Sequence, residues 1–215
     1  MAPTRQKLII LGAGFFAEEV ADLVSEMEAF ELVGFVEGRE RSRCSQKMLG
    51  LPILWIDDLP AFDASHNVVC AIGSTKRSNL IQQAQSLGFG FTSVIHPAAQ
   101  ISASVTIGEG SIISRGAILS AHTRIGSHVI INRGCLIGHH VEISDYATIS
   151  PGANIAGKVK IGDHTFIAMG VNIVEGVTIG KSSMVGAGSL VTNDIPEHVQ
   201  VMGVPARILR NIDAF

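Results

Sequence analysis

The sequence predicts a small α/β domain with a Rossmann-like parallel sheet, followed by a long parallel β-helix. Three observations support this fold class. From residue 99 to residue 192, a branched aliphatic residue recurs every six residues without a break in register. A second period of eighteen residues lies on top of the first, so that three six-residue units complete one coil. Near the N-terminus a strand, a glycine-rich turn and a helix follow one another, as in α/β units that bind nucleotides.

Residues 1–95 are expected to form the α/β domain. Its predicted strands cover residues 7–11, 31–36, 51–56, 67–72 and 91–95. Short apolar runs between glycine-rich turns and helical patterns favour about four or five parallel strands. The domain is too short for both halves of a dinucleotide fold, so a mononucleotide or a nucleotide-linked substrate fits it better than NAD.

Three features of this domain are candidate substrate contacts. The turn Gly12-Ala13-Gly14 precedes a helix, whose N-terminal amides can face an anion. Glu37 ends the second strand, where an acid can bind ribose hydroxyls. The loop from Gly73 to Arg77 offers amides and a guanidinium for phosphate or carboxylate. The alternatives are a tightly packed β–α turn and a solvated acid at a strand end.

The six-residue period predicts the β-helix over residues 96–196, since neither a helix of period 3.6 nor an array of hairpins keeps it for so long. The aliphatic residues are expected to point inward, together with the small or β-branched residue two positions earlier. The aliphatic positions are Ile101, Ile107, Ile113, Leu119, Ile125, Ile131, Ile137, Ile143, Ile149, Ile155, Ile161, Ile167, Ile173, Ile179, Val185 and Val191. Cys135 occupies one of the small-residue positions and is interpreted as packing.

One corner of the predicted prism carries small residues at the eighteen-residue spacing. They are Gly108, Gly126, Ser144, Gly162 and Gly180. We expect this corner to need residues that tolerate unusual backbone dihedral angles.

Residues 197–215 are expected to close the open end of the last coil, which would otherwise expose strand edges. The apolar residues Ile208, Leu209 and Ile212 suggest one or two turns of helix in this tail.

Composition limits the function classes. The net charge of −3 offers no electrostatic argument for nucleic acid or an anionic membrane as a partner. No apolar stretch reaches the length of about 18 residues that a membrane span needs. The three cysteines, Cys44, Cys70 and Cys135, are widely spaced and form no CxxC pair, which favours reduced thiols and a cytoplasmic protein.

Several motifs together resemble one enzyme family. The turn Gly12-Ala13-Gly14 is followed by I-G-S-x-x-R ending at Arg77, the coils, V-x-N-x-x-P ending at Pro196, and G-x-P-A-R ending at Arg207. This order resembles the hexapeptide-repeat sugar acetyltransferases, which include sialic acid O-acetyltransferases and N-acetyltransferases of nucleotide-linked 4-amino-4,6-dideoxy sugars. The resemblance implies a left-handed β-helix, acetyl-CoA as co-substrate, and a homotrimer with CoA between adjacent prisms. The general preference for right-handed crossovers would predict the opposite hand.

The resemblance also implies site residues. Alignment through Asp145-Tyr146 and the segment from Ile149 to Gly152 places the family's catalytic histidine on His139. His140 stands where the family usually has an acid, and Thr148 stands where some members have a second histidine. The positions matching the pantetheine, thioester and adenine contacts are Gly157, Ala168, Met169, Gly170, Pro205, Ala206 and Arg207. The phosphates of the nucleotide sugar would lie at Gly12–Gly14 and at Gly73–Arg77.

Acetyl transfer requires a base, and the two histidines are candidates for it. A sugar amine or hydroxyl must lose a proton to attack a thioester carbonyl, and imidazole, with an ordinary pKa near 6.5, can accept that proton at neutral pH. An amide N–H held by the coil backbone can stabilise the oxyanion. Since His140 replaces the usual acid, Glu142, Asp145 or an acid from a neighbouring subunit remain candidates to orient His139.

The sequence therefore predicts an acetyltransferase that acts on an amine of a nucleotide-linked deoxy amino sugar for cell-surface glycan synthesis. O-acetylation of a sugar, as in the sialic acid enzymes, is the main alternative. A non-catalytic nucleotide-binding protein would leave His139 and His140 as two solvated turn residues. A zinc carbonic anhydrase would need three histidines. The available ones are His122, His128, His139, His140 and His164, and they lack the expected H-x4-H pair.

Overall fold

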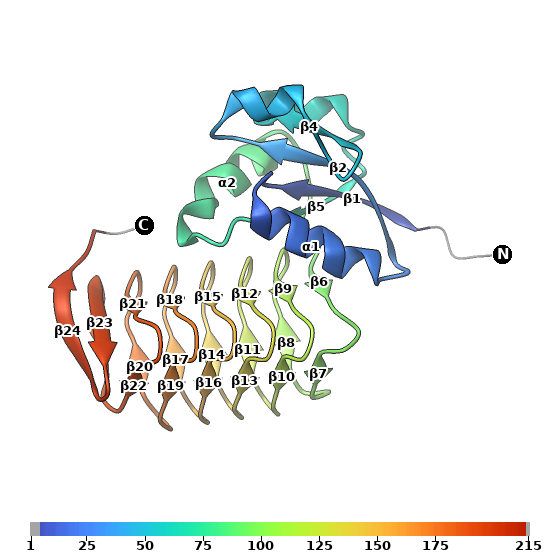
Figure 1. The fold of residues 1–215 in the computed structure, drawn as a ribbon. Helices are drawn as coiled ribbons and strands as arrows, with labels where there is room; N and C mark the ends of the chain where they lie inside the picture. The colour runs from blue at the N-terminus through green and yellow to red at the C-terminus, as the bar shows by residue number, and fades with distance from the viewer. Residues whose placement is uncertain (1–4, 214–215) are drawn as a thin grey trace.

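The computed structural model describes residues 5–213. It contains an α/β domain followed by a stack of parallel strands wound as a left-handed β-helix (Figure 1). The predicted fold class is therefore confirmed.

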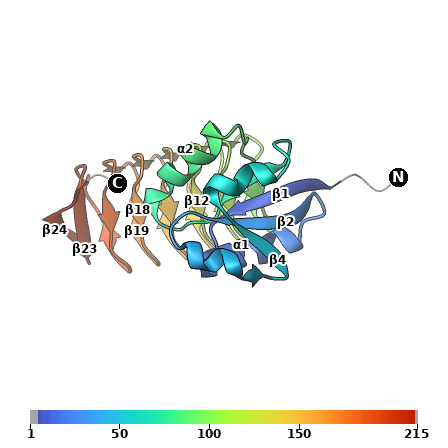
Figure 2. The ribbon, with the colours of Figure 1, turned by 90° about the horizontal axis from the view of Figure 1, so that it is seen from above.

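The sheet of the α/β domain has the strand order β3-β4-β2-β1-β5. Its strands are parallel except for the short β3, which runs antiparallel to β4. Leu8 and Ile10 face the helix α1, whereas Ile9 and Leu11 face α2, because strand side chains alternate. The helices thus cover opposite faces of the sheet (Figure 2). The elements are β1 (Gln6–Leu11), α1 (Phe15–Ser25), β2 (Phe30–Glu37), η1 (Arg41–Ser45), β3 (Lys47–Met48), β4 (Leu51–Trp55), η2 (Ile56–Ala61), β5 (Asn67–Cys70), η3 (Thr75–Arg77) and α2 (Ser78–Ser86).

The strand expected over residues 91–95 does not join this sheet. Only Phe91 forms a bridge, to Val68 of β5. The next strand, β6 (Val94–Ile95), pairs with β9 of the β-helix. Ile95 stands six residues before Ile101, so the six-residue period of the sequence begins at Ile95 or earlier. The expected domain boundary at residue 95 falls at the end of β6.

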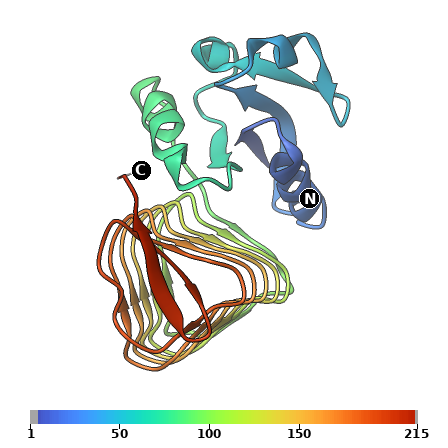
Figure 3. The ribbon, with the colours of Figure 1, turned by 60° about the vertical axis from the view of Figure 1, so that its left-hand side comes forward.

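The β-helix is a triangular prism with three flat faces (Figure 3). The strands from β6 to β22 are two residues long, and each of those up to β19 pairs with the strand eighteen residues further along the chain. Face 1 consists of β6, β9 (Ile112–Ile113), β12 (Ile130–Ile131), β15 (Thr148–Ile149), β18 (Phe166–Ile167) and β21 (Met184–Val185). Face 2 consists of β7 (Gln100–Ile101), β10 (Ile118–Leu119), β13 (Leu136–Ile137), β16 (Asn154–Ile155), β19 (Asn172–Ile173) and β22 (Leu190–Val191). Face 3 consists of β8 (Thr106–Ile107), β11 (Arg124–Ile125), β14 (Glu142–Ile143), β17 (Lys160–Ile161) and β20 (Thr178–Ile179).

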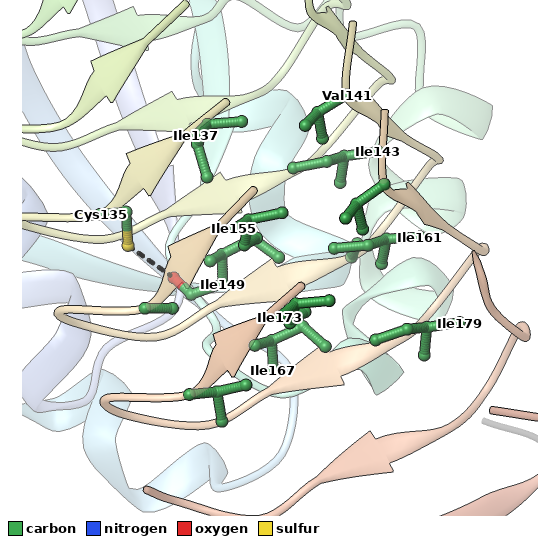
Figure 4. Close-up of a cluster of buried hydrophobic side chains, with 14 of the residues drawn as sticks. Cys135, Ile137, Val141, Ile143, Ile149, Ile155, Ile161, Ile167, Ile173 and Ile179 are labelled. Carbon is green, nitrogen blue, oxygen red and sulfur yellow. Dashed lines mark hydrogen bonds between the residues drawn. The ribbon is translucent and has the colours of Figure 1, made fainter. Parts of the chain in front are cut away.

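The second residue of each strand points into the prism, where the aliphatic side chains stack in ladders (Figure 4). Ile137, Ile155 and Ile173 form one such ladder and are almost fully buried. The Cys135 thiol lies in this core, 3.2 Å from the carbonyl oxygen of Ser150, and burial raises its pKa to about 11. The interpretation of Cys135 as a packing residue is confirmed.

The glycine corner has a different cause from the one expected. Gly108 and Gly162 do not adopt left-handed backbone angles. A Cβ on Gly108 would instead lie 2.5 Å from the carbonyl carbon of Gly126 in the next coil. The glycines therefore permit close approach of successive coils. The left-handed residues stand two positions further on, as at His128 and Tyr146, whose φ angles are 56° and 60°.

The C-terminal tail forms a hairpin of strands, so the expected helix over Ile208–Ile212 is wrong. β23 (Val199–Gly203) pairs parallel to β21 and extends face 1, and β24 (Ala206–Asn211) folds back antiparallel on β23. The edge of face 1 offers unpaired backbone groups that a strand satisfies and a helix does not. Val199 and Val201 are buried over the end of the coil core.

The α/β domain lies on face 1 of the prism (Figures 1 and 3). Ile112 and Ile130 of face 1 belong to the same buried cluster as Leu8 and α1. Arg115, at the corner between faces 1 and 2, forms ion pairs of 2.9 Å with Asp22 and Glu26 of α1. The corner between faces 2 and 3 consequently lies on the side of the prism away from the domain (Figure 3). We call it the distal corner; it includes residues 138–141 and 156–159.

Candidate active site

The predicted catalytic histidines lie next to each other on the distal corner. His139 and His140 follow β13 and are exposed. Their Nδ1 atoms are 3.2 Å apart, a hydrogen bond, and the rings are nearly perpendicular at 85°. His140 is held by its left-handed backbone, by an N–H bond to the Ala121 carbonyl, and by the His122 ring, whose centroid lies 4.8 Å away.

Gly157 lies beside His139 because the two are eighteen residues apart, one coil along the chain. A Cβ on Gly157 would lie 2.6 Å from Cε1 and 2.8 Å from Nε2 of His139. Such contacts are too short for real atoms, so the absence of a side chain at Gly157 makes room for the imidazole. The structure thus brings together His139, His140 and Gly157 from the predicted set.

The two acids expected as possible orienting groups are engaged elsewhere. Glu142 points along face 3 towards Arg124 and Lys160, at 3.8 and 3.9 Å. Asp145 Oδ1 accepts the Ser127 N–H at 2.8 Å, on the corner between faces 1 and 3. Within residues 5–213, His140 is the side chain that is hydrogen-bonded to the His139 ring.

A carboxylate does lie within electrostatic range of His139. The pKa of Glu175 is lowered, first by its hydrogen bond and charge interaction with Lys158 and to a smaller extent by His139. The Glu175–Lys158 pair is 2.7 Å long and exposed.

A second candidate region lies at the carboxyl edge of the α/β sheet. A pocket of about 410 Å³ opens there, at the N-terminus of α1. Five of the six predicted substrate residues line it: Gly12, Ala13, Gly14, Glu37 and Gly73. At Gly12, φ is +115° and a Cβ would lie 2.9 Å from the Ala71 carbonyl oxygen, so this turn requires glycine.

Glu37 is buried, which rules out the alternative of a solvated strand end. Its Oε1 accepts the backbone N–H groups of Gly38 and Arg39, at 2.8 and 2.7 Å. The carboxylate therefore fixes the loop that follows β2 along one wall of the pocket.

The pocket also contains residues that the sequence did not single out. Arg43 of η1 donates to the Ala13 carbonyl at 2.7 Å and to Glu40 at 2.9 Å. Phe15 is 92% exposed at the pocket mouth. Both residues also line an adjoining pocket of about 450 Å³ that reaches Met48 and Leu49. No spacing signal points to Arg43, because it lies in an irregular segment between two strands.

Arg77 does not belong to this pocket, and its placement does not support a role in phosphate binding. The side chain is 1% exposed. Its guanidinium donates to the coil carbonyls of His128, Tyr146 and Ala147 and to the Thr148 hydroxyl, at 2.7 to 2.9 Å. Arg77 thus joins the α/β domain to the β-helix, and Thr148 is one of its partners.

The residues matched to CoA are divided between corners. Gly157 lies on the distal corner, whereas Ala168, Met169 and Gly170 lie between β18 and β19, on the corner between faces 1 and 2. Pro205, Ala206 and Arg207 lie in the β23–β24 hairpin. Within one chain these segments do not form a single cleft.

The histidines considered for zinc are also divided. His122, His139 and His140 lie on the distal corner. His128 and His164 sandwich Tyr146 on the corner between faces 1 and 3, with centroid distances of 5.3 and 4.7 Å. Over residues 5–213, no group of three or more histidine, cysteine or acidic side chains is arranged to hold a metal ion. In the same part of the chain, no helix has the length and apolar character needed to cross a membrane.

Two family models match the chain. Residues 7–84 match the PglD N-terminal domain, and residues 158–193 match the bacterial transferase hexapeptide (six repeats). No curated protein matches.

Solved structures match over nearly the whole chain. PerB from Caulobacter crescentus, in complex with CoA and GDP-perosamine, is 30% identical, with 96% of this chain and 99% of that chain covered and a TM-score of 0.88. The acetyltransferase domain of PglB from Neisseria gonorrhoeae, in complex with acetyl coenzyme A, is 29% identical, with 96% and 100% covered and a TM-score of 0.87. WeeI from Acinetobacter baumannii is 30% identical, with 95% and 100% covered and a TM-score of 0.85. The Caulobacter crescentus enzyme is a perosamine N-acetyltransferase that was also crystallised with one histidine replaced by asparagine or alanine.

Proposed function

The chain belongs to the hexapeptide-repeat family of acetyl-CoA-dependent sugar acetyltransferases, and on that premise we propose that it acetylates an amine of a nucleotide-linked deoxy amino sugar for cell-surface glycan synthesis. His139 is the general base. The observation that carries the proposal is the His139 imidazole beside Gly157 on an exposed corner, in a fold shared with enzymes that bind CoA and GDP-perosamine.

The reaction follows from these groups. The neutral sugar amine attacks the thioester carbonyl carbon, a C–N bond forms, and the C–S bond breaks. The nitrogen loses one proton to His139, and the departing thiolate takes up one proton, which gives an amide and CoA thiol. The Gly157 amide, held by rigid coil backbone, is suited to stabilise the oxyanion. The thioester is already activated, so no covalent enzyme intermediate is needed.

In this proposal the α/β domain expected over residues 1–95 binds the nucleotide sugar, and residues 96–196 carry the base. The tail expected over residues 197–215 closes the coil; residues 1–4, 214 and 215 lie outside the described part of the chain. The phosphates lie against Gly12–Gly14 and Gly73, where the N-terminus of α1 favours negative charge. Glu37 is the candidate partner of the ribose hydroxyls. Arg39 and Arg43, and not Arg77, are the arginines that line the pocket.

The active site in this proposal is completed by a neighbouring subunit. The nucleotide pocket is lined by residues of the α/β domain, which lies on face 1, whereas His139 follows β13 on the distal corner of the same prism. A nucleotide sugar bound in one chain would therefore reach the histidine of another. The CoA segments, which occupy two different corners, point to the same arrangement. A homotrimer around a three-fold axis satisfies both requirements.

Face 2 is the surface that we propose to lie in the trimer interface. Face 1 is covered by the α/β domain, and face 3 carries the charged residues Arg124, Glu142 and Lys160. Face 2 exposes Ile118 and Leu136, at 38% and 44% of their surface. Adjacent exposed aliphatic residues favour burial against a second copy.

Thiol release from acetyl-CoA tests the function. The purified chain would be incubated with 4-amino and 4-hydroxy sugars linked to GDP, UDP, CDP or dTDP. Turnover with an amino sugar that His139→Ala removes while acetyl-CoA binding persists supports the proposal. His198→Asn, which keeps a residue tolerant of the left-handed backbone at a half-buried turn position, is the control. Turnover with hydroxy sugars alone would favour O-acetylation, and near-normal turnover in His139→Ala would remove His139 from the mechanism.

A further inference from the structure

The contact between His139 and His140 joins two like atoms. Their Nδ1 atoms lie 3.2 Å apart, so one ring must donate a proton and the other must accept it with a lone pair. A neutral imidazole carries one N–H and one acceptor nitrogen, and the hydrogen bond made by one nitrogen fixes the state of the other. Two arrangements of the pair are therefore possible.

Only one of them leaves His139 able to act as a base. When Nδ1 of His139 donates to Nδ1 of His140, the Nε2 of His139 carries a lone pair. When His140 donates instead, the proton of His139 lies on Nε2, and that nitrogen cannot accept another. Nε2 is the ring nitrogen of His139 that the contact with His140 leaves free. A Cβ at Gly157 would lie 2.8 Å from Nε2 and 3.1 Å from Nδ1, so both nitrogens face this glycine.

We propose that His140 is a positioning residue whose Nδ1 lone pair keeps the proton of His139 on Nδ1 and so leaves Nε2 free to accept the substrate proton. This inference rests on the proposed function of His139. A carboxylate at this position would only accept and would also stabilise the imidazolium by its charge. The Nδ1 lone pair of His140 supplies an acceptor without that negative charge. The left-handed backbone of His140 and the His122 ring hold it in place.

The charged groups around the pair are few. His122 packs against His140 from the preceding coil. The ion pair of Lys158 and Glu175 lies on the two following coils, and Glu142 is directed to Arg124 and Lys160 on face 3. A carboxylate introduced at position 140 would occupy the position that contacts the His139 ring, so its charge should change the pH profile measurably.

Three substitutions separate the roles of His140. His140→Asn and His140→Asp can place an oxygen where Nδ1 stands, and both residues tolerate left-handed backbone angles. His140→Gly accepts the same backbone but removes the partner. All three would be compared with native enzyme by kcat, by KM for acetyl-CoA, and by the pH dependence of kcat, after trimer mass and circular dichroism have shown an intact fold.

We expect His140→Gly to lower kcat at least about tenfold, with KM for acetyl-CoA within about threefold of native. His140→Asn should restore kcat to within about threefold of native. His140→Asp should also restore it and move the acid limb of the kcat profile about one pH unit upward, because a nearby negative charge favours imidazolium.

The two proposals fail differently. Near-normal turnover in His139→Ala overturns both the base and this inference. An inactive His139→Ala with a fully active His140→Gly overturns this inference alone. Asn and Asp variants as slow as His140→Gly would assign His140 a packing role, and an unmoved acid limb in His140→Asp would contradict the hydrogen bond to His139.

Discussion

Replacement of Gly157 by alanine isolates the position of His139 without touching the imidazole itself. Gly157 does not have a left-handed backbone, so alanine introduces no strain in the backbone angles there. Its Cβ would lie 2.6 Å from Cε1 and 2.8 Å from Nε2 of His139. Ordinary contacts need about 3.5 Å, so the ring must move by about 0.7 to 0.9 Å. A misplacement of about 1 Å at a reacting group costs about 100-fold in rate, which is the expected fall in kcat.

The assay is steady-state thiol release, with acetyl-CoA affinity measured separately by calorimetry. Gly90→Ala is the control, since a Cβ there meets nothing within 4 Å. If Gly157 acts through His139, alanine at 157 should have no further effect in a His139→Ala background. A kcat within twofold of native, or an equal loss in both backgrounds, would refute the reasoning.

Three further predictions concern stability and assembly. Arg77→Met should lower the free energy of unfolding, measured by urea titration, by at least about 3 kcal/mol, because several buried carbonyls lose their hydrogen-bond donor. An unchanged free energy of unfolding would show that Arg77 does not join the domains. Burial, followed by the charge of Arg77, lowers the pKa of His128 to about 4. The His128 imidazole is therefore protonated less readily in the folded state than in the unfolded state. Stability should therefore decline as the pH falls from about 6.5 towards 4, and His128→Phe should decline less over that window; equal slopes would contradict this. Ile118→Lys combined with Leu136→Lys should give a mass of one chain in light scattering and abolish activity, whereas an intact trimer would remove face 2 from the interface.

The six-residue period was sufficient to predict the β-helix because each unit supplies its own inward aliphatic residue. The same period predicts that residues eighteen apart lie one above the other, as His139 and Gly157 do. Ile95 shows that the register could have been followed further back than residue 99.

Tertiary contacts explain the errors. From its position in a loop, the guanidinium of Arg77 was predicted to bind phosphate. The sequence does not show that the α/β domain packs on face 1, where the coil carbonyls accept hydrogen bonds from Arg77. The spacing of Ile208, Leu209 and Ile212 fits a helix, but the unpaired edge of face 1 makes a strand more favourable. The sequence did not predict that Arg43 lines the pocket, because its position there depends on the contact of η1 with the Gly12–Gly14 turn.

Product identification tests the central claim most directly. Native enzyme and His139→Ala would be incubated with acetyl-CoA and a nucleotide-linked 4-amino-4,6-dideoxy sugar, and the sugar product analysed by mass spectrometry and NMR. The account predicts one added acetyl group on the sugar nitrogen with native enzyme and almost none with the variant. Acetylation by both proteins at equal rates, or an acetyl group on oxygen, would contradict it.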